Sequence, residues 1–325
     1  MDSDDVCVLI PTYNEAATIG SVIDGFTEQG YTNVLVIDGH SSDDTRTIAT
    51  EHGARVIEQR RSGKGQAVRE ALEYVEVPYV VMIDGDATYD PSAIEDLLEP
   101  LRNGRAEHVI GDRLEEIDPA AMSRMNRIGN RLINTAFTLI HGRDFADILS
   151  GYRAFTRSSI EQMSLSADGL TIETELAVAC VKHRIPTAVV PIDYRPRPNG
   201  SESNLDPVRD GGRIFHTLYR LARTNNPVFY FGSLGLCSVL FGSTVGAYVG
   251  YEWFVVHVSH EALAVLSAFA ILLGVQLFMF GVVTDMVVAV NREHTRQIES
   301  LAEQLHETAD TEPQERSAQE SERRH

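Results

Sequence analysis

Short apolar runs alternate with polar turns along the first part of the chain. Runs of strand length occur five times, at residues 6–10, 34–37, 55–58, 80–83 and 108–110. A stretch with helical character follows each of the first four runs, which is the pattern of strand–helix units. Four such units in succession predict an α/β domain built on a doubly wound parallel sheet.

The run 80–83 leads directly into Asp84-Gly85-Asp86. Because the run is apolar throughout, we expect a strand covered on both faces, with the two carboxylates at its C-terminal end. Ligands of open α/β sheets bind at this edge. Two acids separated by one glycine suit a divalent cation on a diphosphate. For this fragment alone, a strand followed by an acidic turn is the alternative.

Two further acids follow predicted strands. Glu15 comes after the run 6–10, within Pro11-Thr12-Tyr13-Asn14-Glu15, and Asp38 comes after the run 34–37. Parallel strands end at one edge of a sheet, so Glu15, Asp38 and Asp84 are expected to converge there. Unrelated acidic turns would explain one of these positions more easily than all three.

Arginines are concentrated after the fifth strand. A helical stretch from Arg113 to about His141 carries Arg124, Arg127 and Arg131 among apolar residues. Guanidinium groups bind phosphates through paired hydrogen bonds, although a solvated helix face explains any single one of these arginines other than Arg113.

The segments that follow Arg131 are predicted more briefly. Asp147 opens a loop that enters a strand, residues 170–183 form a helix with two acids in its first turn, and 189–194 form a strand. Residues 195–204 are rich in Pro, Gly and Ser and contain two arginines. This composition is typical of a mobile lid over an anionic ligand.

The C-terminal part contains two long apolar runs. Residues 228–251 carry no charge, and residues 262–290 carry only Asp285. Each is long enough to span a hydrocarbon core of roughly 30 Å. An amphipathic, arginine-rich segment at 206–226 precedes them and suits a membrane surface, with a core-facing domain helix as the alternative.

These segments define four predicted regions. They are a cytosolic catalytic domain (1–205), a juxtamembrane helix (206–226), two transmembrane helices (227–291) and an acidic tail (292–325). Arginines flank the hairpin on both sides, whereas its connecting loop has neither Lys nor Arg. The positive-inside rule therefore predicts a multi-pass cell-membrane protein with both termini in the cytosol.

Composition limits the partners. The chain has 325 residues and a formal net charge of −19, which disfavours nucleic acid as a ligand. Lysine is scarce and arginine supplies nearly all positive charge, which fits adaptation to concentrated salt. The three cysteines lie in apolar runs without metal-binding spacing, so we interpret them as buried thiols.

Six motifs together resemble family 2 glycosyltransferases. They occur in the family's order: Pro11 to Glu15, the turn after Asp38, Gly63-Lys64-Gly65, Asp84-Gly85-Asp86, Asp147 to Arg153, and the loop from Arg197 to Ser203. With two C-terminal spans, the chain is similar to the polyprenyl-phosphate (dolichyl-phosphate) hexosyltransferases, and with its salt-adapted composition it resembles in particular the haloarchaeal enzymes of this branch that serve S-layer N-glycosylation. The resemblance implies a GT-A fold, a Rossmann-like mixed sheet with helices on both faces, followed by a transmembrane hairpin.

The resemblance also implies roles for individual residues. The nucleotide sugar would be bound by Pro11, Tyr13, Glu15, Asp38, Lys64, Asp84 and Arg197. Mg²⁺ or Mn²⁺ would be bound by Asp84 and Asp86, with Asp86 also counted as catalytic. The lipid phosphate would be bound by Arg113, Arg127 and Arg131. Asp147 would orient the acceptor or act as a base, with capping of its own loop as the alternative.

Two positions depart from the family pattern. Thr88 stands where this branch often has Gln as a third metal ligand, and Asn204 stands where a Lys often closes the lid motif. Both departures put the corresponding contacts in doubt.

The expected activity is an inverting transfer of a hexose from a nucleotide sugar to dolichyl or polyprenyl phosphate in the membrane lipid. UDP-glucose is the preferred donor by resemblance, with GDP-mannose as the second choice. The alternatives are a family 2 enzyme that extends a glycan on a hydroxyl group and a non-catalytic membrane scaffold that binds nucleotide sugars. The sequence leaves open whether the chain forms a homo-oligomer.

Overall fold

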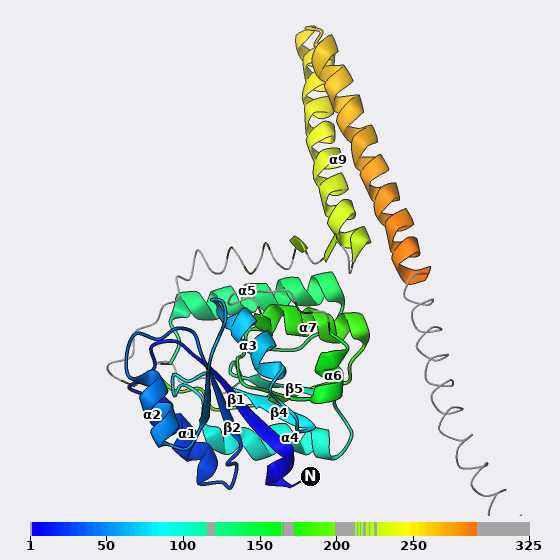
Figure 1. Cartoon of the computed structure of the whole chain (residues 1–325). Coiled ribbons are helices and arrows are strands. Elements are labelled where there is room, and N and C mark those ends of the chain that lie inside the picture. The colour runs from blue at the N-terminus through cyan, green and yellow to red at the C-terminus, as the bar shows by residue number, and fades with distance from the viewer. Residues whose placement is uncertain are drawn as a thin grey trace, which may run out of the picture. The chain divides into compact units, whose positions relative to one another are not determined.

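The computed structural model describes residues 2–115, 121–163, 165, 172–198 and 226–290, with single positions between 212 and 223 (Figure 1). The chain divides into two compact units, Met1–Leu221 and Ala222–His325, and each is described by itself. The predicted lid beyond residue 198, most of the amphipathic segment 206–226 and the acidic tail 292–325 lie outside the described residues.

A seven-stranded sheet forms the centre of the first unit. Its order is β3-β2-β1-β4-β6-β5-β7. The strands are β1 (Val6–Thr12), β2 (Val34–Asp38), β3 (Arg55–Glu58), β4 (Tyr79–Met82), β5 (His108–Asp112), β6 (Arg153–Thr156) and β7 (Thr187–Pro191). Strand β6 runs antiparallel to both of its neighbours, β4 and β5, whereas the other pairs are parallel. The mixed sheet is therefore confirmed. The five strands predicted from the apolar runs, β1 to β5, all run in the same direction, and only β6, predicted as a strand after the Asp147 loop, runs against them.

Helices connect the strands. They are α1 (Ile19–Thr27), α2 (Thr45–Glu51), α3 (Lys64–Leu72), α4 (Ile94–Arg102), α5 (Arg124–His141), α6 (Arg157–Glu161) and α7 (Ile172–His183), with short 3-10 turns at Ser3–Asp5 and Pro91–Ala93. Helix α1 begins only at Ile19, so that six residues separate it from the end of β1 at Thr12. The amides of Glu15 and Ala16 donate to side chains of Thr45 and Asp43, so the loop after β2 holds this segment as a turn.

The last strand is also displaced from its predicted range. Strand β7 ends at Pro191, whereas the sequence predicted a strand over 189–194. Tyr194 instead forms an isolated antiparallel bridge with Tyr89, and the amide of Arg195 donates to the Thr88 carbonyl at 2.8 Å. The chain therefore leaves the sheet and runs beside the loop that contains Asp86.

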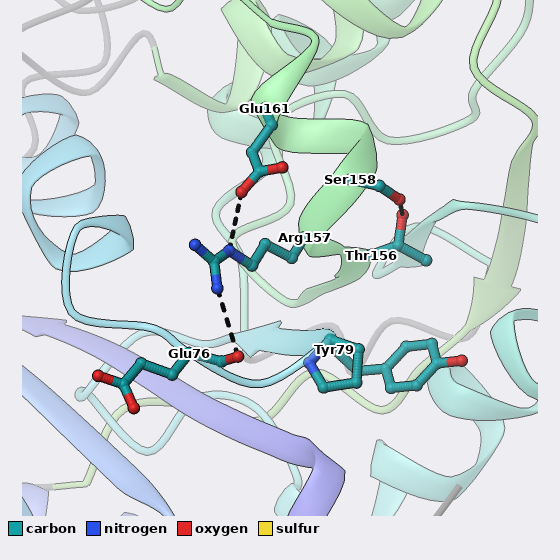
Figure 2. Close-up of a pocket in the computed structure, with 7 residues that line it drawn as sticks. Glu76, Tyr79, Thr156, Arg157, Ser158 and Glu161 are labelled. Atoms are coloured by element: carbon teal, nitrogen blue, oxygen red, sulfur yellow. Dashed lines mark hydrogen bonds and ion pairs between the residues drawn. The ribbon is translucent and has the colours of Figure 1, made fainter. Parts of the chain in front are cut away.

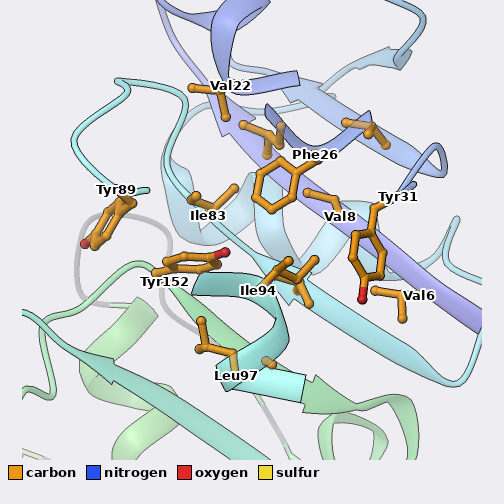
Figure 3. Packing of buried hydrophobic residues seen from close by; sticks show 14 of the residues in the cluster. Val6, Val8, Val22, Phe26, Tyr31, Ile83, Tyr89, Ile94, Leu97 and Tyr152 are labelled. Atoms are coloured by element: carbon orange, nitrogen blue, oxygen red, sulfur yellow. The ribbon is translucent and has the colours of Figure 1, made fainter. Parts of the chain in front are cut away.

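The hydrophobic core lies under the ends of β1 and β4. Val8 and Ile83 pack with Phe26 of α1, Ile94 of α4 and the ring of Tyr152, which lies next to β6 (Figure 3). Complete burial of one such side chain stabilises the fold by roughly 1.5–3 kcal/mol. This core fixes the positions of the loops that carry Glu15, Asp84 and Asp86.

Two long helices form the described part of the second unit. Helix α9 (Pro227–Tyr251) continues as a π-helical turn to Val256, and a second helix covers Glu261–Val290. Both are long and apolar enough to cross a membrane, with mean hydropathies of 1.6 and 2.4. Their backbones approach closely at small residues: the Ser267 hydroxyl donates to the Gly242 carbonyl at 2.7 Å. The helices match the predicted spans and suggest membrane association, while the orientation stays a prediction.

Candidate active site

The predicted donor residues lie at one edge of the sheet. Strands β2, β1 and β4 are neighbours, and Asp38, Glu15 and Asp84 come at or just after their C-terminal ends. Arg197 links two of these loops, with its guanidinium 2.6 Å from an Asp86 oxygen and 3.8 Å from a Glu15 oxygen. The structure therefore brings Glu15 and Asp86, from the loops after β1 and β4, together around one cation.

Asp84 is held from two sides. Its Oδ1 accepts from the ammonium of Lys64, the first residue of α3, and this ammonium also pairs with Glu173 in the first turn of α7. Its other oxygen packs against the backbone of Gly151, where a Cβ would collide with the carboxylate. The amide of Gly151 donates to the Tyr89 hydroxyl at 2.9 Å, which fixes that backbone.

Asp86 is oriented by its own loop and by the segment after β7. The backbone amide and the hydroxyl of Thr88 donate to its Oδ1 at 3.1 and 2.6 Å, and Arg197 contacts its Oδ2. Thr88, which stands where this branch often has Gln, therefore acts as a hydrogen-bond donor that fixes Asp86.

The other nucleotide-binding candidates differ in exposure. Pro11 is buried within β1, and the ring of Tyr13 is half exposed. Asp38 is fully buried and accepts from the amide and hydroxyl of Ser41 at 2.9 and 2.5 Å. In this structure the Asp38 carboxylate shapes the loop after β2, and its proposed contact with the nucleoside stays a prediction.

Arg113 and Asp147 form a buried pair. The Arg113 guanidinium donates to both carboxylate oxygens of Asp147, at 2.6 and 2.9 Å, and its charge lies 5.3 Å from the centre of the Tyr194 ring. Burial opposes the charge of Arg113, but Asp147 outweighs it and the pKa of Arg113 is raised. Both groups are thus committed to each other, which favours a positioning role for Asp147.

Helix α5 carries the remaining lipid-phosphate candidates. Arg131 is exposed, and Arg127 is partly buried with its Nε shielded from solvent and without a hydrogen-bond partner among the described residues. The next polar side chain on that flank, Asn134, accepts the amide of Ile148 at 2.9 Å. Asn134 thus ties α5 to the loop that contains Asp147, and Arg131 and Arg127 precede Asn134 by about one and two turns on the same flank.

Glu173 was not assigned a role from the sequence. Its position in the first turn of a predicted helix was evident, but its pairing with Lys64 joins segments far apart in the chain. The side chain of Glu173 is only 6% exposed. A buried carboxylate at this depth is uncommon unless it is paired.

Asp84 and Asp86 form an acidic pair whose oxygens suit a divalent cation. No group of three or more His, Cys, Asp or Glu side chains that could hold a metal occurs among the described residues. Mg²⁺, however, is usually held by one or two carboxylates together with substrate phosphates. Asp84 and Asp86 offer hard oxygen ligands, and both now accept from side-chain cations, so the pair fits a metal completed by a diphosphate.

A surface hollow with a volume of about 460 Å³ lies elsewhere (Figure 2). It is lined by residues that include Tyr79 at the start of β4 and Arg157 on α6. Because Asp84 follows the other end of β4, this hollow is not part of the candidate site.

Comparisons with known proteins agree with this geometry. Residues 7–163 match the model for glycosyl transferase family 2. The chain is 56% identical to glycosyltransferase AglJ of Haloferax volcanii over 92% of this chain and 98% of that protein. It is 35% identical to the dolichyl-phosphate hexose transferase of the same organism, over 67% of this chain and 94% of that protein.

A solved structure shares the fold. Glucosyl-3-phosphoglycerate synthase from Mycobacterium tuberculosis, in complex with Mn²⁺, UDP and glucosyl-3-phosphoglycerate, superposes with a TM-score of 0.57 and 26% identity, covering 67% of this chain and 79% of the other. Membership of one family explains the mixed sheet, the order of the motifs and these similarities. This chain belongs to glycosyl transferase family 2 and has the GT-A fold that its motifs predicted.

Proposed function

We propose that the protein transfers a hexose from a nucleotide sugar to a polyprenyl or dolichyl phosphate, with inversion at the anomeric carbon. The observation that carries this proposal is the exposed apolar face of α5, a helix whose Asn134 is hydrogen-bonded to the loop that packs against Asp84. The donor part is supported by solved neighbours that bind Mn²⁺ and UDP-glucose, and the acceptor part by a relative named as a dolichyl-phosphate hexose transferase.

The exposed face of α5 supports a lipid acceptor. Four large apolar side chains are 56–71% exposed, namely Met125, Ile128, Leu132 and Leu139. At about 100° per residue they fall within about 60° of arc, on the side away from the buried Phe137. An apolar stripe of this kind on a helix that also carries arginines suits the boundary between lipid tails and headgroups.

The arginines occupy one flank of this stripe. Arg124, Arg131 and Arg127 follow it within about the next 100° of the helix circumference, and Asn134 comes after them. Asn134 holds the loop of Asp147, whose Gly151 packs against Asp84. A phosphate bound by the arginines would therefore approach the acidic pair from the lipid-facing side of the helix.

The reaction needs little proton transfer. A phosphate monoester has a second pKa of about 6, so an acceptor oxygen is largely ionised at neutral pH. It forms the new bond to the anomeric carbon while the bond to the diphosphate breaks and its electrons pass to the leaving oxygen. A metal bound by Asp84 and Asp86 would supply positive charge against that diphosphate.

The chain's own cations have complementary tasks in this proposal. Lys64 and Arg197 would stabilise the diphosphate as negative charge develops on it. Arg127 and Arg131 would bind the acceptor phosphate. Asp147 would keep Arg113 and the adjoining loop in place, so that the acceptor is oriented without a general base.

The test is a transfer assay on the full chain in nanodiscs. Labelled UDP-glucose and GDP-mannose are each offered with polyprenyl phosphate, with the free polyprenol and with a soluble glycan. We expect transfer to the phosphate only, and at least a hundredfold loss in Asp86→Asn. Asp90→Asn is the matched control, because Asp90 lies in the same loop but pairs with Arg195. Transfer to the glycan but not to the lipid phosphate would refute the proposed acceptor.

A second pair of variants tests the acceptor site. Arg127→Gln should raise KM for the lipid phosphate about tenfold or more and leave KM for the nucleotide sugar unchanged. Arg105→Gln, which removes an exposed arginine paired with Glu99, should change neither constant. Equal effects of Arg127→Gln on both KM values would contradict the assigned position of the acceptor phosphate.

A further inference from the structure

The Lys64 ammonium is shared between two carboxylates that differ in exposure and in their proposed roles. Asp84 belongs to the proposed metal site and its side chain is 27% exposed, whereas the Glu173 side chain is 6% exposed. Lys64 itself is 16% exposed and lies at the N-terminus of α3. The cluster contains one positive and two negative formal charges, so it holds one negative charge in excess.

Asp84 and Glu173 differ in the other groups that they can bind. Asp84 can accept a metal, and it is confined by the Gly151 backbone on its other side. Glu173 projects from the first turn of α7, so its backbone is fixed by a twelve-residue helix. When Asp84 takes up a cation, its attraction for the ammonium weakens, and Glu173 is the partner that remains for Lys64.

We infer that Glu173 is a positioning residue that holds Lys64 in the site and thereby lets Asp84 exchange this ammonium for the metal of the donor complex. This inference rests on the proposed function, because it assigns Asp84 to the metal. It assigns to Glu173 a task that neither the sequence motifs nor the similarities to known proteins indicate.

The electrostatic surroundings support the assignment. Burial alone would lower the pKa of Lys64, but Asp84 and then Glu173 outweigh it, so the pKa is raised and the ammonium stays charged. Glu173 also attracts Arg153, whose own pKa is lowered mainly by complete burial. Arg153 donates to the carbonyls of Ser150 and Ile148, so it supports the backbone beside Asp84.

Glu173→Gln removes one negative charge and leaves Lys64 with Asp84 as its only charged partner among the described residues. The metal must then compete with the ammonium for Asp84, and the site has lost one negative charge, so it attracts cations less strongly than in the wild-type chain. Both effects weaken Mn²⁺ binding. A nucleoside diphosphate without metal meets less negative charge, so its affinity should stay equal or rise. A variant that was merely misfolded would lose both.

The experiment measures Mn²⁺ by electron paramagnetic resonance and UDP by calorimetry, on the full chain in nanodiscs. With UDP present, Glu173→Gln should raise the Mn²⁺ dissociation constant about tenfold, while the affinity for metal-free UDP does not fall. Glu175→Gln is the matched control, since Glu175 is also buried and lies two residues further along α7, and it should change neither value.

A double-mutant cycle tests whether Glu173 acts through Lys64. In a Lys64→Met background, Glu173→Gln should change the Mn²⁺ dissociation constant less than threefold. A full tenfold effect in that background, or an unchanged Mn²⁺ affinity in the single variant, would overturn the inference. If the wild-type chain bound neither UDP nor Mn²⁺ with UDP, the proposed function itself would fail, which is a separate outcome.

Discussion

The pair of Arg113 and Asp147 allows a test that separates structure from chemistry. Asp147 is fully buried, Arg113 is 8% exposed, and two hydrogen bonds join their side chains. Asp147→Asn keeps the size of the side chain but removes its charge. The guanidinium is then buried without a compensating carboxylate, and one Asn amide group must face its donors.

The expected cost follows from this geometry. Removing one partner of a buried ion pair costs about 3–5 kcal/mol, a large fraction of the roughly 5–15 kcal/mol that stabilises a typical domain. Replacing both partners with apolar residues is often nearly neutral. We therefore expect Asp147→Asn to destabilise the region around β5 strongly, and the double variant Arg113→Met with Asp147→Leu to recover most of the loss.

Amide hydrogen exchange on the full chain measures this cost locally. The peptides to compare cover residues 108–115 and 144–156, with peptides from α1 as an internal reference. In Asp147→Asn the free energy of opening should fall by about 3–5 kcal/mol in both peptides. Unchanged exchange together with a more than hundredfold loss of transfer would refute this reasoning and identify Asp147 as a group that reacts with the acceptor.

Three further predictions follow from single positions. Gly151→Ala should reduce transfer at least tenfold because the new Cβ collides with the Asp84 carboxylate, whereas Gly129→Ala, with open space around it, should keep activity. Burial lowers the pKa of His141 to about 4, so the unfolded chain takes up a proton at a higher pH than the folded chain does. The free energy of unfolding should therefore decrease by about 3 kcal/mol as the pH falls from about 6.5 to 4. His141→Phe should flatten this pH dependence in denaturation curves. Burial raises the pKa of Cys7 to about 12, so iodoacetamide at pH 8 should label Cys7 only after unfolding, as mass spectrometry would show.

The sequence predicted where strands lie better than how they run. The run before Asp84 was found because a strand covered on both faces is apolar throughout. Strand β6 was predicted as the strand after the Asp147 loop, but the sequence carries no sign of the direction in which a strand runs, so its antiparallel orientation was not predicted. The strand also begins with Arg153, which is fully buried and donates to loop carbonyls, and this burial of a charged residue has no signal in the sequence.

The site residues show a similar division. Acids that follow strands were expected at one edge, because topology alone places strand ends together. The pairing of Lys64 with Glu173 could not be predicted, since it depends on where α7 packs relative to α3. The commitment of Asp147 to Arg113 was equally hidden, because both residues are typical of phosphate chemistry as well as of buried ion pairs.

The exposure of the three central ion pairs indicates which of them can open during turnover. Asp147 has a fully buried side chain and both of its oxygens bind Arg113, so opening this pair would leave two charges in the protein interior. The side chains of Asp84 and Asp86 are 27% and 9% exposed, and the cations that contact them, Lys64 and Arg197, come from outside the loop of these acids. Exchange of one cation for another at these carboxylates avoids the cost of an uncompensated charge, and the side chains of Lys64 and Arg197 are themselves 16% and 26% exposed. The pairs of Asp84 and Asp86 are therefore suited to exchange with a metal and a diphosphate, while the pair of Asp147 is suited to keep the site in shape throughout.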